Sequence, residues 1–376
     1  MKIEILKENL KNGLGIIERI AGRNQSLPIL DNVLMSTEDS FLSLSSTDLE
    51  TAIKIWILTK IVKKGKVVVP AKFFSSFVAL LPNEKITLEE KSQGLSIECQ
   101  SFKNQIQGFD PEEFPLIPEF QNLEFLEIDN KKFCQGLSQI VDIASPSQSR
   151  PEISGIYFIF SKNLIKIVAT DSFRLAEKSI VLEGPIKQEL SFILPQKPAR
   201  ELINILGDKE GKIKIYFSPS QTMFEFPMKD IPRPQMQIIS RLIEGEYPNY
   251  EEIIPKKFKT HVVIKRDEFL NQIKAASLFS GKINEIKVKV SSQAKEIEIF
   301  AQSPGVGESR SSISAKIEGE EIEASFNYKF LSEGLLNIKS SEVVFDLSKE
   351  EGPCVLRPVG DTSYIYVVMP IKSTQA

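Results

Sequence analysis

The chain has 376 residues and a formal net charge of −3, and 41% of its residues are apolar. This length allows two or three domains that each bury a core, and the composition is ordinary for a globular protein. The three cysteines are far apart and form no CxxC pair, and there is one histidine, so we expect no metal site, no cofactor and a reducing compartment. We find no signal-peptide pattern and no segment of membrane-spanning length, so we expect a cytoplasmic protein.

Three segments begin in the same way, at residues 1–21, 125–145 and 261–280. Each reads as a short alternating strand followed by apolar residues at the spacing of an amphipathic helix, such as Leu10, Leu14 and Ile17. The pattern predicts helices over 6–20, 130–144 and 266–279. Asp129 or Asn130 is a candidate N-cap of the second helix, and Asp267 lies before or within the first turn of the third.

A second strand-then-helix unit recurs at residues 67–82, 192–207 and 325–338, and it predicts helices over 71–81, 196–206 and 327–338. Lys72, Lys197 and Lys329 occupy matching positions in these units, at separations of 125 and 132 residues. Ala169 and Ala301, in a different motif, are also 132 residues apart. Two independent landmarks that share one offset indicate a true internal repeat.

Short β-rich runs fill the segments between the helices, with Gly, Asn, Ser and Lys clusters that are typical of hairpin turns. The predicted strands are 41–44, 53–56, 86–88, 95–98, 155–160, 212–217, 286–290, 296–301, 343–347 and 364–369. The sequence therefore predicts an α+β chain of three similar domains, 1–122, 123–257 and 258–376. Each domain would be an antiparallel sheet with two helices on one face, and repeats of this size suit a bead string, an arc or a ring.

One turn motif appears most fully at residues 167–175, which read IVATDSFRL. A weaker copy, LSSTDLETA, occupies 44–52, and a degenerate one, IFAQSPGVG, occupies 299–307. Asp and Ser side chains bond nearby backbone groups, so the motif predicts a strand, a tight turn and a second strand. The first copy has no counterpart of the apolar and cationic pair Phe173-Arg174. We therefore expect a structural turn in every repeat and a docking site only in the second.

The six predicted helices carry a net charge of +4, although the whole chain carries −3. A mildly basic helical surface on an acidic body fits loose, sequence-independent contact with phosphates. The alternative for any single helix is an ordinary solvated face. The candidate phosphate-contacting residues, on these helices or flanking their ends, are Lys7, Lys11, Arg23, Lys72, Arg150, Lys197 and Arg200.

Signals of catalysis are absent from the sequence. It contains no GxSxG elbow and no GxxxxGK[ST] loop, and His261 stands alone at the start of a predicted strand. No pair of carboxylates stands out from the acidic turns. We expect a non-catalytic protein and assign no catalytic residue.

Seven motifs in order resemble one known family over the whole chain. They are LPIL at 27–30, TDLE at 47–50, VPA at 69–71, FP at 114–115, ATDSFRLA at 169–176, YPNYEEIIP at 247–255 and YVVMP at 366–370. The chain is similar to the beta subunit of bacterial DNA polymerase III, the sliding-clamp family. The resemblance implies a homodimer closed head to tail into a ring around duplex DNA, with the basic helical residues above facing the DNA. It also implies a non-catalytic processivity factor that binds the replicative polymerase subunit, the clamp loader, other polymerases and repair proteins through short peptides.

The resemblance also implies two protein-contact sites. The dimer interface would include Ile106, Leu278 and Phe279, which are otherwise ordinary core residues. The cleft for partner peptides would consist of Ile153, Thr170, Ser172, Phe173, Arg174, Leu175, Pro248, Ile253, Phe330, Val367, Met369, Pro370 and Ile371. An apolar groove with Met and Pro suits short hydrophobic peptides. Without the resemblance, Val367 and Met369 would read as alternate residues of a core strand.

Four positions depart from the family pattern. Members of the family commonly have Gly and then His or Tyr where this chain has Ser172-Phe173. They often have a basic residue where this chain has Glu252, and Tyr where it has Phe330. These differences leave the peptide preference open. Two other functions also remain open: a monomeric peptide-binding adaptor, and a repeat-domain hydrolase or transferase with its site at a domain interface.

Overall fold

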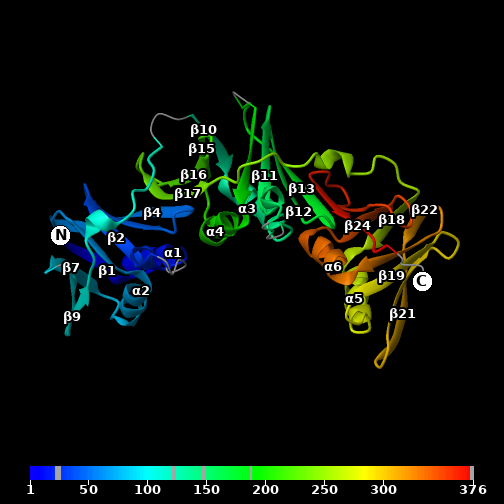
Figure 1. The fold of residues 1–376 in the computed structure, drawn as a ribbon, viewed down its shortest axis with the longest axis horizontal. Coiled ribbons are helices and arrows are strands. Elements are labelled where there is room, and N and C mark those ends of the chain that lie inside the picture. Colours follow the sequence, from blue (N-terminus) through cyan, green and yellow to red (C-terminus); the bar gives the residue numbers. More distant parts are fainter. Residues whose placement is uncertain are drawn as a thin grey trace. The chain divides into compact units, whose positions relative to one another are not determined.

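The computed structural model describes residues 1–21, 27–92, 94–120, 124–144, 147, 149–186 and 189–372. By contacts between residues, the chain divides into two compact units, residues 1–134 with 197–242, and residues 135–196 with 243–376. Each unit consists of two antiparallel sheets with helices packed against them (Figure 1).

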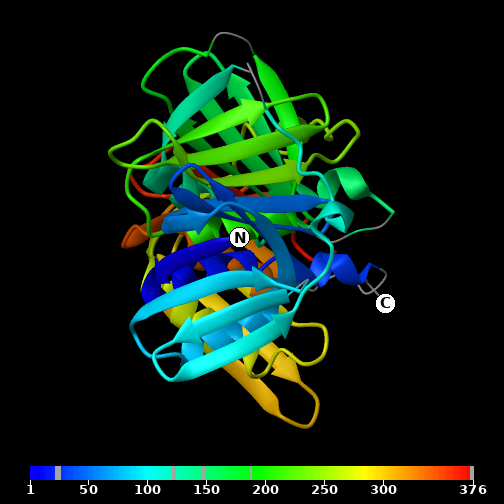
Figure 2. The ribbon, with the colours of Figure 1, turned by 90° about the vertical axis from the view of Figure 1, so that its left-hand side faces the viewer.

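The first unit has a five-stranded sheet and an eight-stranded sheet. The smaller has the order β5 (Lys60–Lys63), β1 (Lys2–Leu6), β7 (Lys85–Lys91), β8 (Gly94–Cys99) and β9 (Phe102–Gln107). The larger has the order β10 (Phe125–Asp129), β15 (Lys212–Phe217), β16 (Gln221–Pro227), β17 (Pro234–Arg241), β4 (Thr51–Leu58), β3 (Phe41–Thr47), β2 (Asn32–Glu38) and β6 (Lys66–Pro70). In Figure 2 the five-stranded sheet, in blue and cyan, faces the viewer.

The second unit has a nine-stranded sheet and a four-stranded sheet. The larger has the order β14 (Leu190–Pro195), β11 (Gly155–Ser161), β12 (Leu164–Thr170), β13 (Arg174–Val181), β26 (Tyr364–Val368), β25 (Cys354–Pro358), β24 (Glu342–Leu347), β18 (Thr260–Lys265) and β22 (Lys316–Gly319). The smaller has the order β21 (Gly307–Ser314), β20 (Glu296–Ser303), β19 (Glu285–Ser291) and β23 (Ile322–Asn327).

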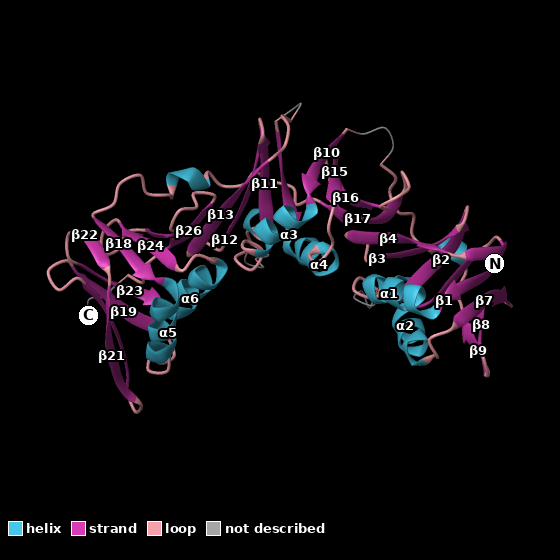
Figure 3. Ribbon diagram, turned by 180° about the vertical axis from the view of Figure 1, so that it is seen from behind, coloured by secondary structure: helices cyan, strands magenta, loops and turns pink. Residues whose placement is uncertain are grey.

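The six predicted helices are present. They are α1 (Lys7–Ile17), α2 (Ala71–Leu80), α3 (Asn130–Ser138), α4 (Gln196–Leu206), α5 (Arg266–Ser277) and α6 (Tyr328–Asn337). Leu10, Leu14 and Ile17 are fully buried, as the spacing predicts. Within their units, α1 packs beside α2 and α5 packs beside α6 (Figure 3). Four single-turn 3₁₀ helices, η1 (Pro28–Asp31), η2 (Pro111–Glu113), η3 (Pro151–Ile153) and η4 (Tyr250–Glu252), complete the helical elements of the described residues.

Helix α3 ends six residues before the predicted end at Ala144. Its start is as expected, because Asp129 Oδ1 accepts the Lys132 amide at 2.8 Å as an N-cap. Beyond Ser138 the chain continues in tighter turns, with the Ile140 amide bonded to the Leu137 carbonyl at 3.0 Å. The Gln196 side-chain amide donates to the carbonyls of Val141 (2.7 Å) and Ala144 (3.0 Å), which supplies these backbone acceptors with partners from outside the segment.

Two of the four sheets cross the borders of the sequence repeats. β4 of the first repeat pairs with β17 of the second, with Ala52 opposite Ile239. β13 of the second repeat pairs in the same way with β26 of the third, with Leu175 opposite Val367. This pairing leaves no open sheet edge at either junction, and it explains why the compact units divide the second repeat between them.

Within the described part of the chain, no helix combines the length and apolar character needed to cross a membrane.

A candidate protein-docking surface

The predicted turn at Thr170–Arg174 is a closed network of hydrogen bonds. The Thr170 hydroxyl donates to the Arg174 carbonyl at 2.7 Å, and Asp171 Oδ1 accepts the amides of Phe173 (3.0 Å) and Arg174 (2.9 Å). Ser172, at the tip, has a φ of 76°, in the left-handed region that favours glycine. The turn therefore holds Phe173 and Arg174 in fixed positions at the start of β13.

The copy in the first repeat forms the same network. The Thr47 hydroxyl donates to the Thr51 carbonyl at 3.0 Å, and Asp48 Oδ1 accepts the amides of Glu50 (3.2 Å) and Thr51 (2.7 Å). Leu49 matches Ser172, with a φ of 74°. The prediction that the Thr-Asp turn is a structural unit is confirmed for these two repeats.

Arg174 is fully engaged inside the protein. Its Nε donates to Asp171 Oδ2 at 3.0 Å, its guanidinium pairs with Glu333 of α6, and it lies 4.7 Å from the centre of the Phe330 ring. Only 9% of its side chain is exposed. Arg174 therefore fixes the turn to α6 and supports the Phe330 ring, and both of its charge partners belong to the chain itself.

Phe173 is the largest exposed side chain of the turn, at 62% relative accessibility. Its ring stacks on Phe330 with 6.2 Å between centroids, and its carbonyl accepts the Met369 amide at 2.9 Å. The Tyr366 hydroxyl donates to the Phe330 carbonyl at 2.8 Å, which fixes the other ring of the pair. An exposed aromatic ring stacked on a half-buried one is a typical anchor for an apolar partner group.

The predicted cleft residues separate into a buried layer and an accessible one. Leu175 and Val367 belong to a core cluster with Val168, Ile193, Val355, Tyr247 and Tyr250, and Ile153, Thr170 and Pro370 are also buried. Arg174 is half-buried and internally paired. The remaining seven are exposed or half-buried, and we call them the docking surface: Ser172, Phe173, Pro248, Ile253, Phe330, Met369 and Ile371.

The segment that carries Pro248 and Ile253 is fastened to the nine-stranded sheet by aromatic contacts. Tyr247 stacks on Tyr157 of β11 at 4.5 Å, and the Tyr250 hydroxyl donates to Glu177 of β13 at 2.6 Å in a buried contact. Burial, followed by the neighbouring Glu177 carboxylate, raises the pKa of Tyr250 above its ordinary range. The hydroxyl therefore stays a hydrogen-bond donor at neutral pH.

Lys166 of β12 adds a polar link to the same segment. It contacts Glu251 at 2.9 Å and Glu177 at 3.5 Å. A hydrogen bond from Lys166, reinforced by its charge, lowers the pKa of Glu251. The segment is thus held in place by the sheet beneath it.

The position in the first unit that is equivalent to the docking surface carries charged side chains instead. The Arg241 amide donates to the Glu50 carbonyl at 2.9 Å, as Met369 does to Phe173, but the two side chains form an exposed ion pair at 3.6 Å. Lys197 pairs with Asp48 of the turn. Charged pairs thus stand where the docking surface has aromatic and Met side chains, which agrees with the expectation of one docking site per chain.

The candidate phosphate-contacting residues differ in their surroundings. Lys11 and Lys72 are exposed, and no described residue forms an ion pair with either; Lys7 is half-buried and Arg200 is exposed. Lys197 is held by Asp48, and Arg150 contacts Glu152 at 3.1 Å and Ser172 Oγ at 3.4 Å. Arg23 lies outside the described residues.

The candidate dimer residues also differ in exposure. Ile106 on β9 is only 6% exposed, as a core residue would be, whereas Leu278 is 76% exposed. Leu278 and Phe279 lie just after α5 rather than at its end, because the helix stops at Ser277 and the next amides bond in tighter turns.

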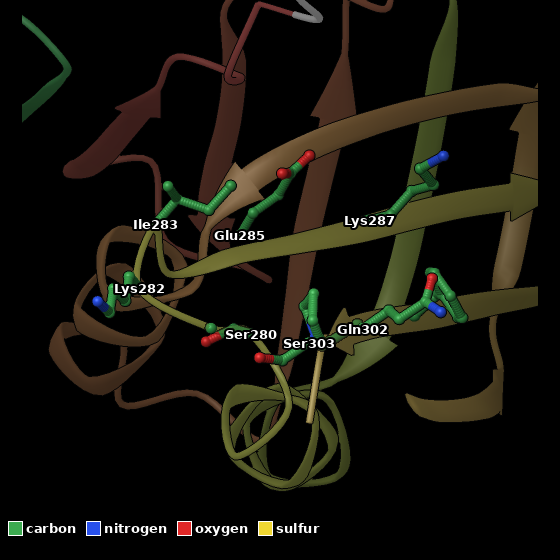
Figure 4. A pocket seen from close by; sticks show the side chains of 11 residues that line it. Ser280, Lys282, Ile283, Glu285, Lys287, Gln302 and Ser303 are labelled. Atoms are coloured by element: carbon green, nitrogen blue, oxygen red, sulfur yellow. The ribbon is translucent and has the colours of Figure 1, made fainter. Parts of the chain in front are cut away.

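A pocket of about 450 Å³ is lined by Ser280, the residue after Phe279, and by residues of β19 and β20. Figure 4 shows its labelled lining: Ser280 and Ser303 on one side, and Ile283, Glu285 and Lys287 of β19 and the loop before it on the other. The lining mixes charges of both signs with apolar groups and includes no nucleophile paired with a base. We assign no chemistry to it.

Three residues that support the docking surface are missing from the sequence prediction: Glu177, Tyr250 and Glu333. Glu333 follows Phe330 by three positions, so helical spacing places both on one face of α6. It also lies 132 residues after Glu201, the offset shared by Lys197 and Lys329. The contact between Tyr250 and Glu177 joins residues 73 positions apart, and no local pattern indicates it.

Comparison with known proteins places the chain in a family. Models of the N-terminal, central and C-terminal domains of the DNA polymerase III beta subunit match residues 1–118, 127–249 and 251–372. A beta sliding clamp of Synechococcus elongatus is 27% identical over 380 residues, covering 99% of each chain, and one of Staphylococcus aureus is 28% identical over 359 residues, covering 93% of each. The DNA polymerase sliding clamp of Bacillus subtilis has a crystal structure that matches with a TM-score of 0.94 and 26% identity, over 99% of each chain. The chain therefore belongs to the DNA polymerase III beta subunit family, the sliding clamps that act as processivity factors in DNA replication.

Proposed function

We propose that two copies of the chain close head to tail into a ring around duplex DNA, and that the ring tethers the replicative polymerase, the clamp loader and other DNA-processing proteins. Short apolar peptides of these partners would bind the docking surface. We also propose that the chain consists of three domains, 1–122, 123–257 and 258–376, and that its role is not catalytic. The observation that carries the proposal is the exposed ring of Phe173 stacked on the half-buried ring of Phe330, in a chain of the sliding-clamp family.

Ring closure is supported by strand edges in both units. β9 ends the five-stranded sheet and β21 ends the four-stranded sheet, so each presents an unpaired backbone edge. Leu278, next to the four-stranded sheet in sequence, is a large apolar side chain exposed to solvent. Heterologous contact between different edges of two identical chains closes a ring when the rotation fits.

Contact with DNA in this proposal is electrostatic and weak. Lys11 and Lys72 would bind phosphates without reading bases, because a tether that slides cannot form deep base contacts. We propose that the remaining candidates also face the DNA; they are Lys7, Arg23, Arg150, Lys197 and Arg200.

Peptide binding tests the docking role with a matched control. Phe173→Ala removes the exposed ring, whereas Leu49→Ala changes an exposed apolar residue of the duplicate turn. We expect Phe173→Ala to weaken binding of a fluorescent peptide from the polymerase subunit by about tenfold or more, as an aromatic anchor does. Leu49→Ala should leave the affinity unchanged. Equal affinity of both variants and the unaltered chain would refute the docking surface.

Light scattering on the same samples tests the ring. A dimer for the unaltered chain and for Phe173→Ala supports it, and a monomer at micromolar concentration would favour the peptide-binding adaptor instead.

A further inference from the structure

We infer that the docking surface selects peptides that carry a basic residue beside their apolar anchor, on the side of the surface formed by residues 244–254. This inference rests on the proposed peptide-docking function and adds the charge of the partner to it. Two independent features of the second unit support it: the pairing of its nearby arginines within the chain, and the acidity of residues 244–254.

The two arginines near the docking surface, Arg150 and Arg174, already have partners within the chain. Arg174 is held between Asp171 and Glu333 and is 9% exposed. Arg150 contacts Glu152 at 3.1 Å. Arg174 is therefore unavailable to a carboxylate of a partner, and the charge of Arg150 is balanced by Glu152.

Residues 244–254, read EGEYPNYEEII, contain four glutamates and no lysine or arginine. All four glutamates are exposed. Glu251 is balanced by Lys166, which Glu177 shares. Glu252 accepts a hydrogen bond from the side-chain amide of Asn249 at 2.7 Å. No cation among the described residues forms an ion pair with Glu252.

The fold places this negative charge next to the docking surface. Tyr247 and Tyr250 of the segment pack into the same core cluster as Leu175 of β13 and Val367 of β26, two strands that carry or adjoin docking-surface residues. In the single turn of η4, Tyr250 is buried, and Glu252 and the adjacent Ile253 are both exposed. Glu252 thus borders Ile253, a docking-surface residue.

Two lysines adjoin other residues of the docking surface. Lys329 precedes Phe330 and Lys372 follows Ile371, and both are exposed. Exposed charges of opposite sign therefore border the docking surface, with Glu252 beside Ile253 and Lys329 beside Phe330. A peptide with its basic residue toward Glu252 gains attraction, and one with an acidic residue there meets repulsion and finds no free arginine.

The test uses the full chain and three versions of one peptide. The peptide is a fluorescein-labelled apolar segment of the polymerase subunit from the same organism, with Lys, Ser or Glu at one flanking position, and each end is tried in turn. Anisotropy at about 0.05 M and about 0.5 M salt gives the affinities, because exposed charge pairs are screened at the higher concentration. The protein variants are Glu252→Lys, Glu252→Gln and, as a control of equal charge change, Glu210→Lys at an exposed site in the other unit.

We expect the Lys peptide to bind more tightly than the Glu peptide by about three- to fivefold at low salt, for one end of the peptide only. Glu252→Gln should reduce this preference, Glu252→Lys should reverse it, and Glu210→Lys should keep it. High salt should remove it. Equal affinities of the three peptides at low salt, while Phe173→Ala still abolishes binding, would overturn the inference and leave the docking surface intact. Binding that is insensitive to Phe173→Ala would overturn the docking surface and the inference together.

Discussion

At the scale of single residues, Ser172 shows how the docking turn departs from the family pattern. Its φ of 76° lies where a side chain is strained by about 1–2 kcal/mol and glycine is not. Glycine is the residue that the family resemblance implies at this position. The chain keeps the turn with serine because the bonds from Thr170 and Asp171 hold the backbone on both sides of it.

Substitutions at Ser172 should report this strain. Ser172→Gly relieves it but loosens the unfolded chain, so we expect a free energy of unfolding within about 1 kcal/mol of the unaltered protein. Ser172→Val should cost about 1–2 kcal/mol, because a β-branched residue is poorly tolerated there. Denaturant unfolding measures both, with Ser191→Val on β14 as an exposed control with extended backbone. Equal stability of Ser172→Val and Ser191→Val would contradict the account.

The residues of the turn are also where sequence reasoning succeeds and fails most clearly. Thr170 and Asp171 are recognisable because their side chains bond within four residues along the chain. The role of Arg174 is only half visible, because its second carboxylate, Glu333, is 159 positions away. From the sequence, Arg174 is expected to contact partner peptides. In the structure its guanidinium is paired with Asp171 and Glu333 of the same chain.

At the scale of elements, an ion network joins hairpins from two sequence repeats within the first unit. Glu38 on β2 accepts the Trp56 indole at 2.8 Å and pairs with Lys54 (2.9 Å) and Arg233 (3.3 Å), which follows β16. Burial alone would raise the pKa of Glu38, but the bonds from Trp56 and Lys54 and the charges of Lys54 and Arg233 lower it below its ordinary value. Sequence periodicity predicts the strands here but not their neighbours, so the pairing of β4 with β17 and this network were not predictable.

The network should make stability depend on pH in one direction. Because the pKa of Glu38 is lowered in the folded state, its contribution is present above the unfolded pKa and is lost as pH falls through the folded one. Glu38→Gln should therefore lower the free energy of unfolding by roughly 1 kcal/mol at pH 7, and the difference should vanish in acid. Thermal unfolding from neutral to acidic pH measures it, with Glu98→Gln, on the exposed pair with Lys103, as a control. A constant difference between Glu38→Gln and the unaltered chain at every pH would contradict the assignment.

At the scale of the whole molecule, the described residues repeat one turn network and one way of joining sheets, and we propose that one of these junctions binds partner peptides. The ring that we propose would hold DNA by topology, so a mild positive charge on the helices would suffice. The number of repeats and the helices could be predicted from the sequence, because they rest on local spacing and on a constant offset. The division into compact units could not, because it depends on which strands pair.

Two lysines on the helices of the first unit test the DNA contact. Lys11→Ala with Lys72→Ala should reduce the salt dependence of binding to a short linear duplex, by about 2 in the slope of log K against log salt if each lysine contacts one phosphate. The control is the double variant Lys63→Ala with Lys64→Ala, on β5 and in the loop after it. It removes the same number of positive charges from a place outside the helices. An equal loss of slope in both double variants would show that only net charge matters.

Retention on DNA of different topology tests the central claim most directly. The chain is loaded by its clamp loader onto a nicked circular plasmid, half of the sample is cut once to make the DNA linear, and both are passed through a gel-filtration column in moderate salt. A closed ring held by topology stays with the circular DNA and slides off the linear DNA. Equal retention on circular and linear DNA would contradict the ring.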